Sequence, residues 1–349
     1  MWPYWMMYFV AASGVLSPSD LPKRQSVFAF AVVAATFLIL IGFRHEVGGD
    51  WFTYLPHFDN DKIASISELL TTTDPAYHIL DWAAAQLGYD IYAVNVVCAA
   101  ILMIGTFIFC RGQPNSWLAL LVAVPYMLIV VGMGYTRQSA ALGFALMGLA
   151  ALKNNRVVSF TILVALGTLF HKSGILLLPV SALAASKNRV LTAVLVLGTS
   201  ILLYYLLLED VAGRLWVNYV EREMESEGGA TRVAMNAIPA TLMLLFRRQL
   251  APDTTERILW CWMAVLALIC VPIVGLASTA VDRVALYLIP IQLFVFSRIP
   301  RLAVTSNGRT ALVFGIVGYY GAVQYVWLNY ASHAQYWLPY QFMPIGGPA

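Results

Sequence analysis

Charged residues are scarce in this chain of 349 residues: Asp, Glu, Lys and Arg make up 11% of it, against roughly 25% in a typical soluble domain. Hydrophobic residues account for 60%, and the mean hydropathy is +0.74. A soluble fold of this size could not hide so much apolar surface, whereas lipid can accommodate it. The composition therefore predicts an integral membrane protein. The net charge of +3 is too small to indicate a nucleic-acid partner.

Cysteine and targeting signals are also sparse. The four cysteines lie in or at the ends of apolar runs, and none has metal-ligand spacing. They are best interpreted as small buried hydrophobic residues. Residues 1–16 are apolar, but no Lys or Arg precedes them and no clear cleavage site follows, so we expect a retained first span. The cysteines are Cys98, Cys110, Cys261 and Cys270.

In lipid, every backbone polar group needs a partner within its own segment, so we expect helical spans. Several apolar runs are shorter than the roughly 20 residues of a full crossing. Either flanking polar residues complete them, or they surround a water-accessible cavity. We predict an all-α polytopic bundle with short central spans around a cavity open to the outer, periplasmic face. The twelve candidate spans are 1–16, 26–43, 91–110, 116–134, 138–152, 157–170, 174–186, 190–208, 237–246, 258–280, 284–298 and 310–330.

Most Lys and Arg residues fall in alternate short loops between these runs. Because cytoplasmic loops are enriched in Lys and Arg, we place these loops in the cytoplasm and both chain termini outside. Residues 1–349 then form one membrane domain, whose long outer loops 44–90 and 209–236 carry interfacial helices. The basic residues of the cytoplasmic loops are Lys23, Arg24, Arg111, Lys153, Arg156, Lys187, Arg189, Arg247, Arg248, Arg257, Arg298, Arg301 and Arg309.

Charges at the outer ends of spans are the candidates for function. A charge costs roughly 2.5–3.5 kcal/mol at mid-membrane and is retained mainly when it is paired or used. The densest segment runs from Arg44 to Tyr54 and includes Glu46, Gly48 and Asp50. Its glycine pair allows a sharp turn and a close approach to a ligand. Asp50 then opens an amphipathic helix, where it could simply cap free amides, while Arg44 could simply reach the membrane interface.

Two further segments combine charge with a position between apolar runs. Arg137, beside Gln138, carries a rigid and permanently charged guanidinium that suits phosphate, or it pairs with an acid. His171 is a candidate general base because the ordinary pKa of histidine is near 6.5. Phosphate binding and a structural role are its alternatives. Lys172 is a candidate phosphate contact. Arg283 is another, unless it pairs with its neighbour Asp282.

Two patterns in the outer loops have ordinary as well as functional explanations. Asp59-Asn60-Asp61 matches the D-x-D that holds a divalent metal in some membrane glycosyltransferases, and it equally fits a solvated turn after a helix. Outer aromatic residues could stack on sugar rings, or they could form the interfacial belt of a membrane protein. These aromatic residues are Trp51, Tyr54, Tyr77, Trp82, Tyr89, Tyr92, Tyr330, Tyr336, Trp337 and Tyr340.

Four motifs follow one another in the order Arg44-x-x-x-Gly48-x-Asp50-Trp51-x-x-Tyr54, Asp74-Pro75-x-Tyr77, Arg137-Gln138 and His171-Lys172-Ser173. In order, spacing and placement at span ends, this sequence resembles the EpsG/Wzy-type bacterial polysaccharide polymerases of exopolysaccharide and O-antigen synthesis. The resemblance covers about residues 44–283. The positions that it implies for the site are Arg44, Gly48, Asp50, Tyr54, Arg137, Gln138, His171 and Lys172.

The resemblance also implies an activity, a substrate and a location. Such a polymerase is a glycosyltransferase of the bacterial inner membrane that joins oligosaccharide repeat units carried on undecaprenyl pyrophosphate at the periplasmic face. The growing chain passes from its lipid carrier to the non-reducing end of a new unit. The expected partners are the lipid-linked oligosaccharide, the surrounding lipid and a chain-length regulator.

The residues are consistent with that chemistry. Departure of a lipid pyrophosphate develops negative charge, which fixed cations can stabilise. The acceptor hydroxyl needs a base, for which Asp50 is the first choice, His171 the second and Glu46 the third. If the cations bind pyrophosphate directly, no metal or other cofactor is required. The candidate cations are Arg44, Arg137, Lys172 and Arg283.

Other functions remain open at this stage. One is a metal-dependent glycosyltransferase that uses a polyprenyl-phosphate sugar, with Asp59 and Asp61 on the metal, and another is an O-antigen-type ligase. A lipid-linked oligosaccharide flippase is the third, although transporters place their site at the membrane midplane, whereas these charges gather at one face. Small residues in 139–150 could pack helices within one chain or between chains.

Overall fold

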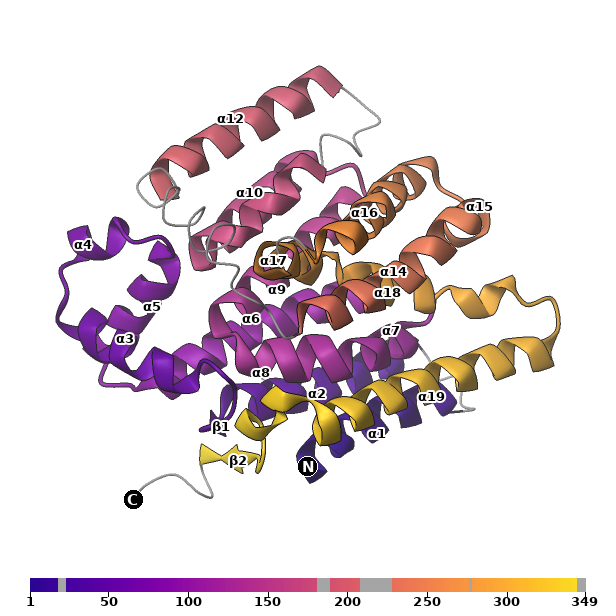
Figure 1. Ribbon diagram of the computed structural model, residues 1–349, viewed down its shortest axis with the longest axis horizontal. Coiled ribbons are helices and arrows are strands. Elements are labelled where there is room, and N and C mark those ends of the chain that lie inside the picture. The colour runs from indigo at the N-terminus through magenta and orange to yellow at the C-terminus, as the bar shows by residue number, and fades with distance from the viewer. Residues whose placement is uncertain (18–22, 181–188, 208–227, 276–277, 344–349) are drawn as a thin grey trace.

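The computed structural model describes residues 1–17, 23–180, 189–207, 228–275 and 278–343, and nearly all of its regular structure is helical (Figure 1). Within these residues, five helices are long and apolar enough to cross a membrane, or six if one bent pair forms a single span. The prediction of an all-α membrane bundle is confirmed, whereas twelve crossings remain a prediction. The five helices are Arg24–Gly42, Ile91–Arg111, Ser116–Gly134, Thr254–Ile273 and Ser306–Tyr330.

The other expected spans form shorter or broken helices. The bent pair is α17 (Ser278–Leu288) and α18 (Pro290–Phe296), which the chain bends by 42° because Pro290 cannot continue the ladder of backbone hydrogen bonds. Residues 172–177 form a 3₁₀ turn, η2, and 181–186 lie outside the described residues. The remaining apolar helices are α1 (Trp2–Leu16), α9 (Thr136–Leu152), α10 (Val157–Phe170), α12 (Arg189–Leu207) and α14 (Gly229–Leu245).

The centre of the bundle is one helical rod made of α7 (Ser116–Ala123), the π-helical η1 (Val124–Val131) and α8 (Gly132–Gly134). Its sequence is apolar on every side, which is the pattern of a helix buried all round, and almost every residue is buried. The rod contacts α1, α6 (Ile91–Arg111), α18 and α19 (Ser306–Tyr330). Pro125 begins the π-helical stretch because it has no N–H for the usual helical bond.

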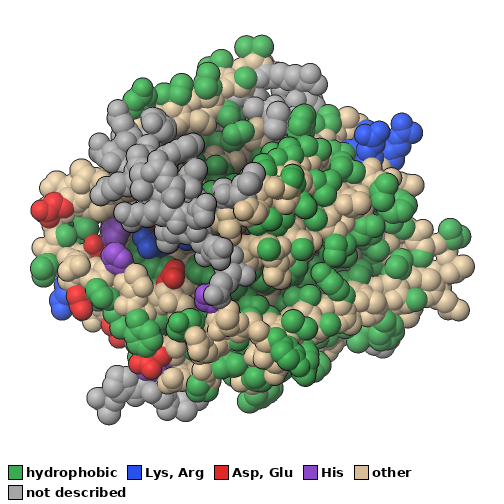
Figure 2. Space-filling view, viewed as in Figure 1, with side chains coloured by type: hydrophobic (Ala, Val, Ile, Leu, Met, Phe, Trp, Pro, Cys, Tyr) green, Lys and Arg blue, Asp and Glu red, His purple; other side chains and the backbone are tan. Residues whose placement is uncertain are grey.

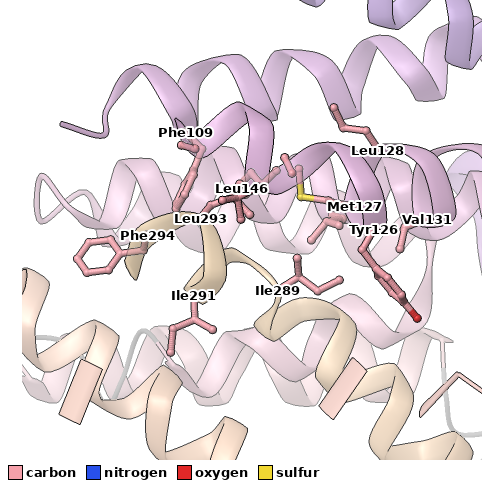
Figure 3. Close-up of a cluster of buried hydrophobic side chains, with 14 of the residues drawn as sticks. Phe109, Tyr126, Met127, Leu128, Val131, Leu146, Ile289, Ile291, Leu293 and Phe294 are labelled. Atoms are coloured by element: carbon pink, nitrogen blue, oxygen red, sulfur yellow. The ribbon is translucent and has the colours of Figure 1, made fainter. Parts of the chain in front are cut away.

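Apolar side chains from α6, the rod, α9 and α18 interdigitate in one cluster (Figure 3). The ring of Phe294 also stacks on Trp260 of α16 (Thr254–Ile273), with centroids 4.1 Å apart. Between membrane helices there is little hydrophobic driving force, so van der Waals packing of this kind holds the bundle together. Residues labelled in Figure 3 are Phe109, Tyr126, Met127, Leu128, Val131, Leu146, Ile289, Ile291, Leu293 and Phe294.

Helices α6 and α9 approach each other through glycine. A Cβ atom added to Gly105 would lie 2.2 Å from the carbonyl oxygen of Gly143, and one added to Gly143 would lie 2.5 Å from the carbonyl oxygen of Ile101. The small residues predicted to pack helices in 139–150 therefore do so within one chain at Gly143. This contact fixes the outer end of α9, which carries Arg137.

The first outer loop folds into a helical layer at the left of Figure 1, made of α3 (Trp51–Ile63), α4 (Ile66–Leu70) and α5 (Pro75–Gln86). Ser65 starts α4 with a capping box that it shares with Glu68. Helix α5 packs on α3, α6 and α10. The amphipathic helix expected after Asp50 is α3, and α4 is a second short helix of the same loop. Of the second outer loop, residues 208–227 lie outside the described residues, while 229–236 begin α14.

The C-terminal segment closes the same end of the bundle. Strand β1 (Arg44–His45) pairs antiparallel with β2 (Gln341–Phe342). Trp337 is almost fully buried, and its indole N–H donates to the carbonyl oxygen of Ile129 at 3.0 Å. Tyr340 donates to the carbonyl oxygen of Leu40 at 2.7 Å. These two aromatic side chains, which the sequence offers as sugar or interface contacts, instead anchor the chain terminus.

The two ends of the bundle differ in charge. Figure 2 shows acidic, basic and histidine side chains together at the left end, over the α3–α5 layer, and apolar side chains over much of the remaining face. At the other end, Glu256 binds Arg298 at 3.0 Å and Lys153 at 3.3 Å. Arg247 and Arg248 are exposed on α15 (Arg247–Leu250) at that end. This polarity agrees with the assignment of the basic loops to one side of the membrane.

The substitution Gly105→Ala should lower the thermal stability of the detergent-solubilised protein by about 1–3 kcal/mol, because the added methyl group forces α6 and α9 apart. Gly318→Ala, on a helix where an added Cβ meets nothing within 4 Å, is the control and should leave stability unchanged or slightly higher. Thermal unfolding followed by circular dichroism measures both. Equal stability of the two variants would show that the glycine contact is not needed.

Candidate functional site

A tight turn at Gly48, between α2 (Lys23–Gly42) and α3, sets the position of the first candidate site residues. Gly48 has a φ of +111°, and a Cβ there would lie 2.2 Å from the carbonyl oxygen of Met133. Both facts require glycine. Its N–H donates to the carbonyl oxygen of Tyr336 at 2.8 Å. The turn therefore presses against the end of the central rod and fixes where Asp50 and α3 begin.

Two of the predicted site residues in this turn lie apart from the rest. Arg44 is buried, with 1% of its surface exposed, and its guanidinium donates to the carbonyl oxygens of Ile41 and Val47 and to Asn95 and Thr136. Glu46 is exposed, 3.9 Å from His45. Arg44 thus holds helix ends together, and Glu46 has no contact with the other candidate groups in the part of the chain that the structure describes.

Asp50 precedes α3 but makes no capping hydrogen bond, so the predicted cap does not form. Its carboxylate instead accepts from the hydroxyl of Tyr54 at 3.5 Å. Burial raises the pKa of Asp50 above its ordinary value, while the charges of Arg283 and Arg137 oppose the rise. The result is a carboxylate held near two guanidinium groups and more basic than a solvated aspartate.

Arg137 lies in the first turn of α9 and pairs with Asp74, the residue before α5, at 3.0 Å. Its guanidinium lies over the rings of Tyr54 and Tyr77, 5.5 and 5.7 Å from their centroids. Asp74 is buried, and its other oxygen accepts from the backbone N–H of Lys172 at 3.0 Å. One carboxylate therefore joins α5, α9 and η2.

His171 ends α10 and is held in place by its neighbours. Its Nδ1 accepts from the backbone N–H of Ser173 at 3.3 Å, and its Nε2 lies 3.3 Å from the side-chain nitrogen of Gln138. Burial lowers the pKa of His171 well below its ordinary value, and the charges of Arg283, Arg137 and Lys172 lower it further. The imidazole is therefore held in its neutral form.

Arg283, on α17, connects this cluster to a cavity of about 960 Å³, which is a usual volume for a ligand site. The cavity lies between the rod, α14, α17 and α19, and it is mostly apolar and aromatic toward α14 and α19. Residues that line it include Tyr126, Val130, Tyr135, Arg232, Ile238, Arg283, Tyr319, Val323, Val326 and Trp327.

The cavity holds an ion pair that the sequence did not indicate. Arg232 of α14 binds Asp282 at 2.6 Å, donates to the hydroxyl of Tyr126 at 3.2 Å and lies over its ring. Asp282 therefore pairs across helices with Arg232 of α14. Arg232 was missed because it lies 50 residues before Asp282 and belongs to no recognisable motif, but a charge inside an apolar helix is itself a signal.

The D-x-D pattern does not form a pair of metal ligands. Asp59 is exposed, whereas Asp61 is buried and lies 2.6 Å from Nδ1 of His78 on α5. Residues two apart on a helix point in different directions, so the two carboxylates diverge.

The fold and the site together define an integral membrane protein whose polar groups converge at one end of an apolar helical bundle. The model of the EpsG family matches residues 27–342. The chain therefore belongs to the EpsG family, which indicates a polysaccharide polymerase type of function. In comparisons with curated proteins and with solved structures, nothing matched.

Gly48→Ala should reduce both stability and activity, because it combines an unfavourable φ with a backbone clash, an effect of about 1–3 kcal/mol. Gly49→Ala is the matched control, since the nearest atoms to an added Cβ, in Trp337, are 3.9 Å away. Thermal unfolding and polymer formation by both variants in membranes provide the comparison. A Gly48→Ala protein as stable as Gly49→Ala would contradict this account of the turn.

Proposed function

We propose that this protein is a polysaccharide polymerase that joins oligosaccharide repeat units carried on undecaprenyl pyrophosphate, at the periplasmic face of the bacterial inner membrane. The supporting observation is the convergence of Asp50, Arg137 and Arg283, from three distant segments, beside a large, mostly apolar cavity. A general base, fixed cations and room for a lipid are the three features that this reaction needs.

The pyrophosphate of the donor binds between Arg137, Arg283 and Lys172. Arginine offers a planar fork of donors that matches phosphate oxygens. Tyr54 and Tyr77 support the guanidinium of Arg137, which lies over both rings. The lipid tail occupies the apolar part of the cavity between α14 and α19, and the sugar extends outward over the α3–α5 layer.

Asp50 accepts the proton of the acceptor hydroxyl at the non-reducing end of the incoming unit. The hydroxyl oxygen then attacks the anomeric carbon of the growing chain, and the bond from that carbon to the phosphate oxygen breaks. The leaving lipid pyrophosphate takes the bonding electron pair, and the guanidinium groups stabilise its charge. Gln138 and His171, whose side chains lie 3.3 Å apart, orient the sugars beside this cluster. A chain-length regulator would act on this protein from outside the site.

Asp50→Asn and Arg137→Ala should abolish chain growth while expression and membrane insertion stay normal. Loss of a general base costs about 10²–10⁴-fold in rate, and loss of a charge-stabilising group costs about 10²–10³-fold. Polymer made by cells that carry each variant, resolved on a gel, is the measurement. Asp59→Asn and Arg248→Ala, which change exposed charges outside the cluster, should polymerise normally. Chain growth at the normal rate in either site variant would remove the assigned role.

The rate of chain growth should fall as the pH drops through the pKa of Asp50, because only the ionised carboxylate accepts a proton. Burial raises this pKa, so the midpoint should lie above the roughly 3.9 of a solvated aspartate. In Arg283→Gln the midpoint should move to higher pH, because a charge that lowers the pKa is gone. In His171→Gln the midpoint should stay in place. A midpoint that shifts in His171→Gln would instead identify the imidazole of His171 as the base.

The direct test mixes the purified protein with its lipid-pyrophosphate repeat unit and resolves the products on a gel. A ladder of polymer supports the proposal. Single-sugar products would favour the polyprenyl-phosphate-sugar glycosyltransferase, and transfer to a lipid acceptor without polymer would favour a ligase. Translocation of the lipid-linked unit across vesicle membranes without any product would favour a flippase.

A further inference from the structure

Helices α3 and α5 bring three metal-ligating side chains together, apart from the cluster around Asp50. Asp61 lies in the last turn of α3, and His78 and Asp81 lie three residues apart on one face of α5. One ligand atom from each residue lies within 4.8 Å of the others. The closest pair is Nδ1 of His78 and Oδ2 of Asp61, at 2.6 Å.

The carboxylate of Asp81 is the unexplained member of this group. The residue is completely buried, and neither of its oxygens has a hydrogen-bond partner in the structure. An ionised carboxylate is costly to bury unless it is paired or coordinates a metal. Burial and the nearby charge of Asp61 raise the pKa of Asp81 to about 9. Either a proton or a cation therefore belongs between these two carboxylates.

We propose that Asp61, His78 and Asp81 bind one divalent transition-metal ion of the zinc class. One imidazole and two carboxylates are a frequent protein ligand set for such ions, whereas magnesium and calcium prefer oxygen alone. Tetrahedral ligands at about 2.0–2.2 Å from a common ion lie about 3.3–3.6 Å apart. The 2.6 Å pair would therefore separate, and the atoms that lie as much as 4.8 Å apart would move closer. Three protein ligands leave a fourth position for water.

The ion would act as a brace between α3 and α5. Tyr54, two turns before Asp61 on α3, packs against Tyr77, the neighbour of His78 on α5, with ring centroids 5.6 Å apart. Arg137 lies over both rings. Fixing the spacing of α3 and α5 therefore fixes the support of Arg137. The three metal ligands are positioning residues, and the inference goes beyond the proposed function because it does not depend on the substrate.

The signal for this site is present in the sequence. Asp61 belongs to the D-x-D pattern, but Asp59 is not a second ligand of the proposed metal site. The other two ligands are His78 and Asp81, which form an H-x-x-D pair on α5, the next long helix of the same loop. Only the packing of α3 on α5 brings them within reach.

The test measures bound metal in the full-length protein, purified without an affinity tag and equilibrated separately with zinc, manganese or magnesium. Elemental mass spectrometry should find about one equivalent of zinc per chain and little magnesium. Asp61→Asn and Asp81→Asn should lose most of this zinc, whereas Asp59→Asn, an exposed change on the same helix, should keep it. Wild-type protein without metal, or site variants with the wild-type amount, would overturn the proposal.

Cobalt provides a second readout, whose first step uses the wild-type protein alone. Bound to the wild-type protein, Co²⁺ should give visible absorption bands of a low-coordinate site, which zinc displaces, and His78→Ala should shift those bands. Zinc should also raise the melting temperature of the wild-type protein but not that of Asp81→Asn. No bands and no shift in melting temperature would instead identify Asp61 and Asp81 as a pair that shares a proton. Metal is measured without substrate, so this result is independent of the polymerase assay.

Discussion

The guanidinium of Arg44 is the interaction on which the outer end of the bundle depends. It donates to α2 through the carbonyl oxygen of Ile41, to α6 through Asn95 and to α9 through Thr136. Burying this charge with fewer hydrogen-bond partners would cost free energy. The ends of these three helices therefore come together around the Arg44 guanidinium. The same contact sets the start of the turn that places Asp50, and the start of α9 that places Arg137. Arg44 therefore shapes the site without facing the substrate.

Asp74 plays the matching role for the outer layer. Its two oxygens bind the side chain of Arg137 and the backbone N–H of Lys172. Because α5 is tied in this way to α9 and η2, the motifs that contain Asp74, Arg137 and Lys172 lie together in one cluster. The glycine contact between α6 and α9 is a second constraint on this end of the bundle, because it holds α9 in one position along α6.

The sequence predicted the class of fold well and the details unevenly. Apolar runs identify membrane helices because the cost of unpaired backbone groups in lipid leaves no other structure. The length of an apolar run did not predict where its helix changes or breaks. Pro125 changes the helix type within the rod, and Pro290 breaks a run into α17 and α18. Likewise, charges at span ends identified most of the cluster, including Asp50, Arg137, Gln138, His171, Lys172 and Arg283. Arg232, His78 and Asp81 were not singled out, because their partners are distant in the sequence.

By itself, then, the sequence determined that this is a helical membrane protein of the EpsG family with charged groups at the ends of its apolar runs. Composition and local motifs carry that information, because charges are costly in hydrocarbon and therefore interrupt or flank apolar runs. Only the tertiary structure decided which charges cooperate. It separated Glu46 from the site, turned Arg44 inward, paired Arg137 with Asp74 and Arg232 with Asp282, and brought Asp61 to His78 and Asp81. Such pairings depend on distances of a few ångströms between helices, which packing of side chains sets and no linear pattern records.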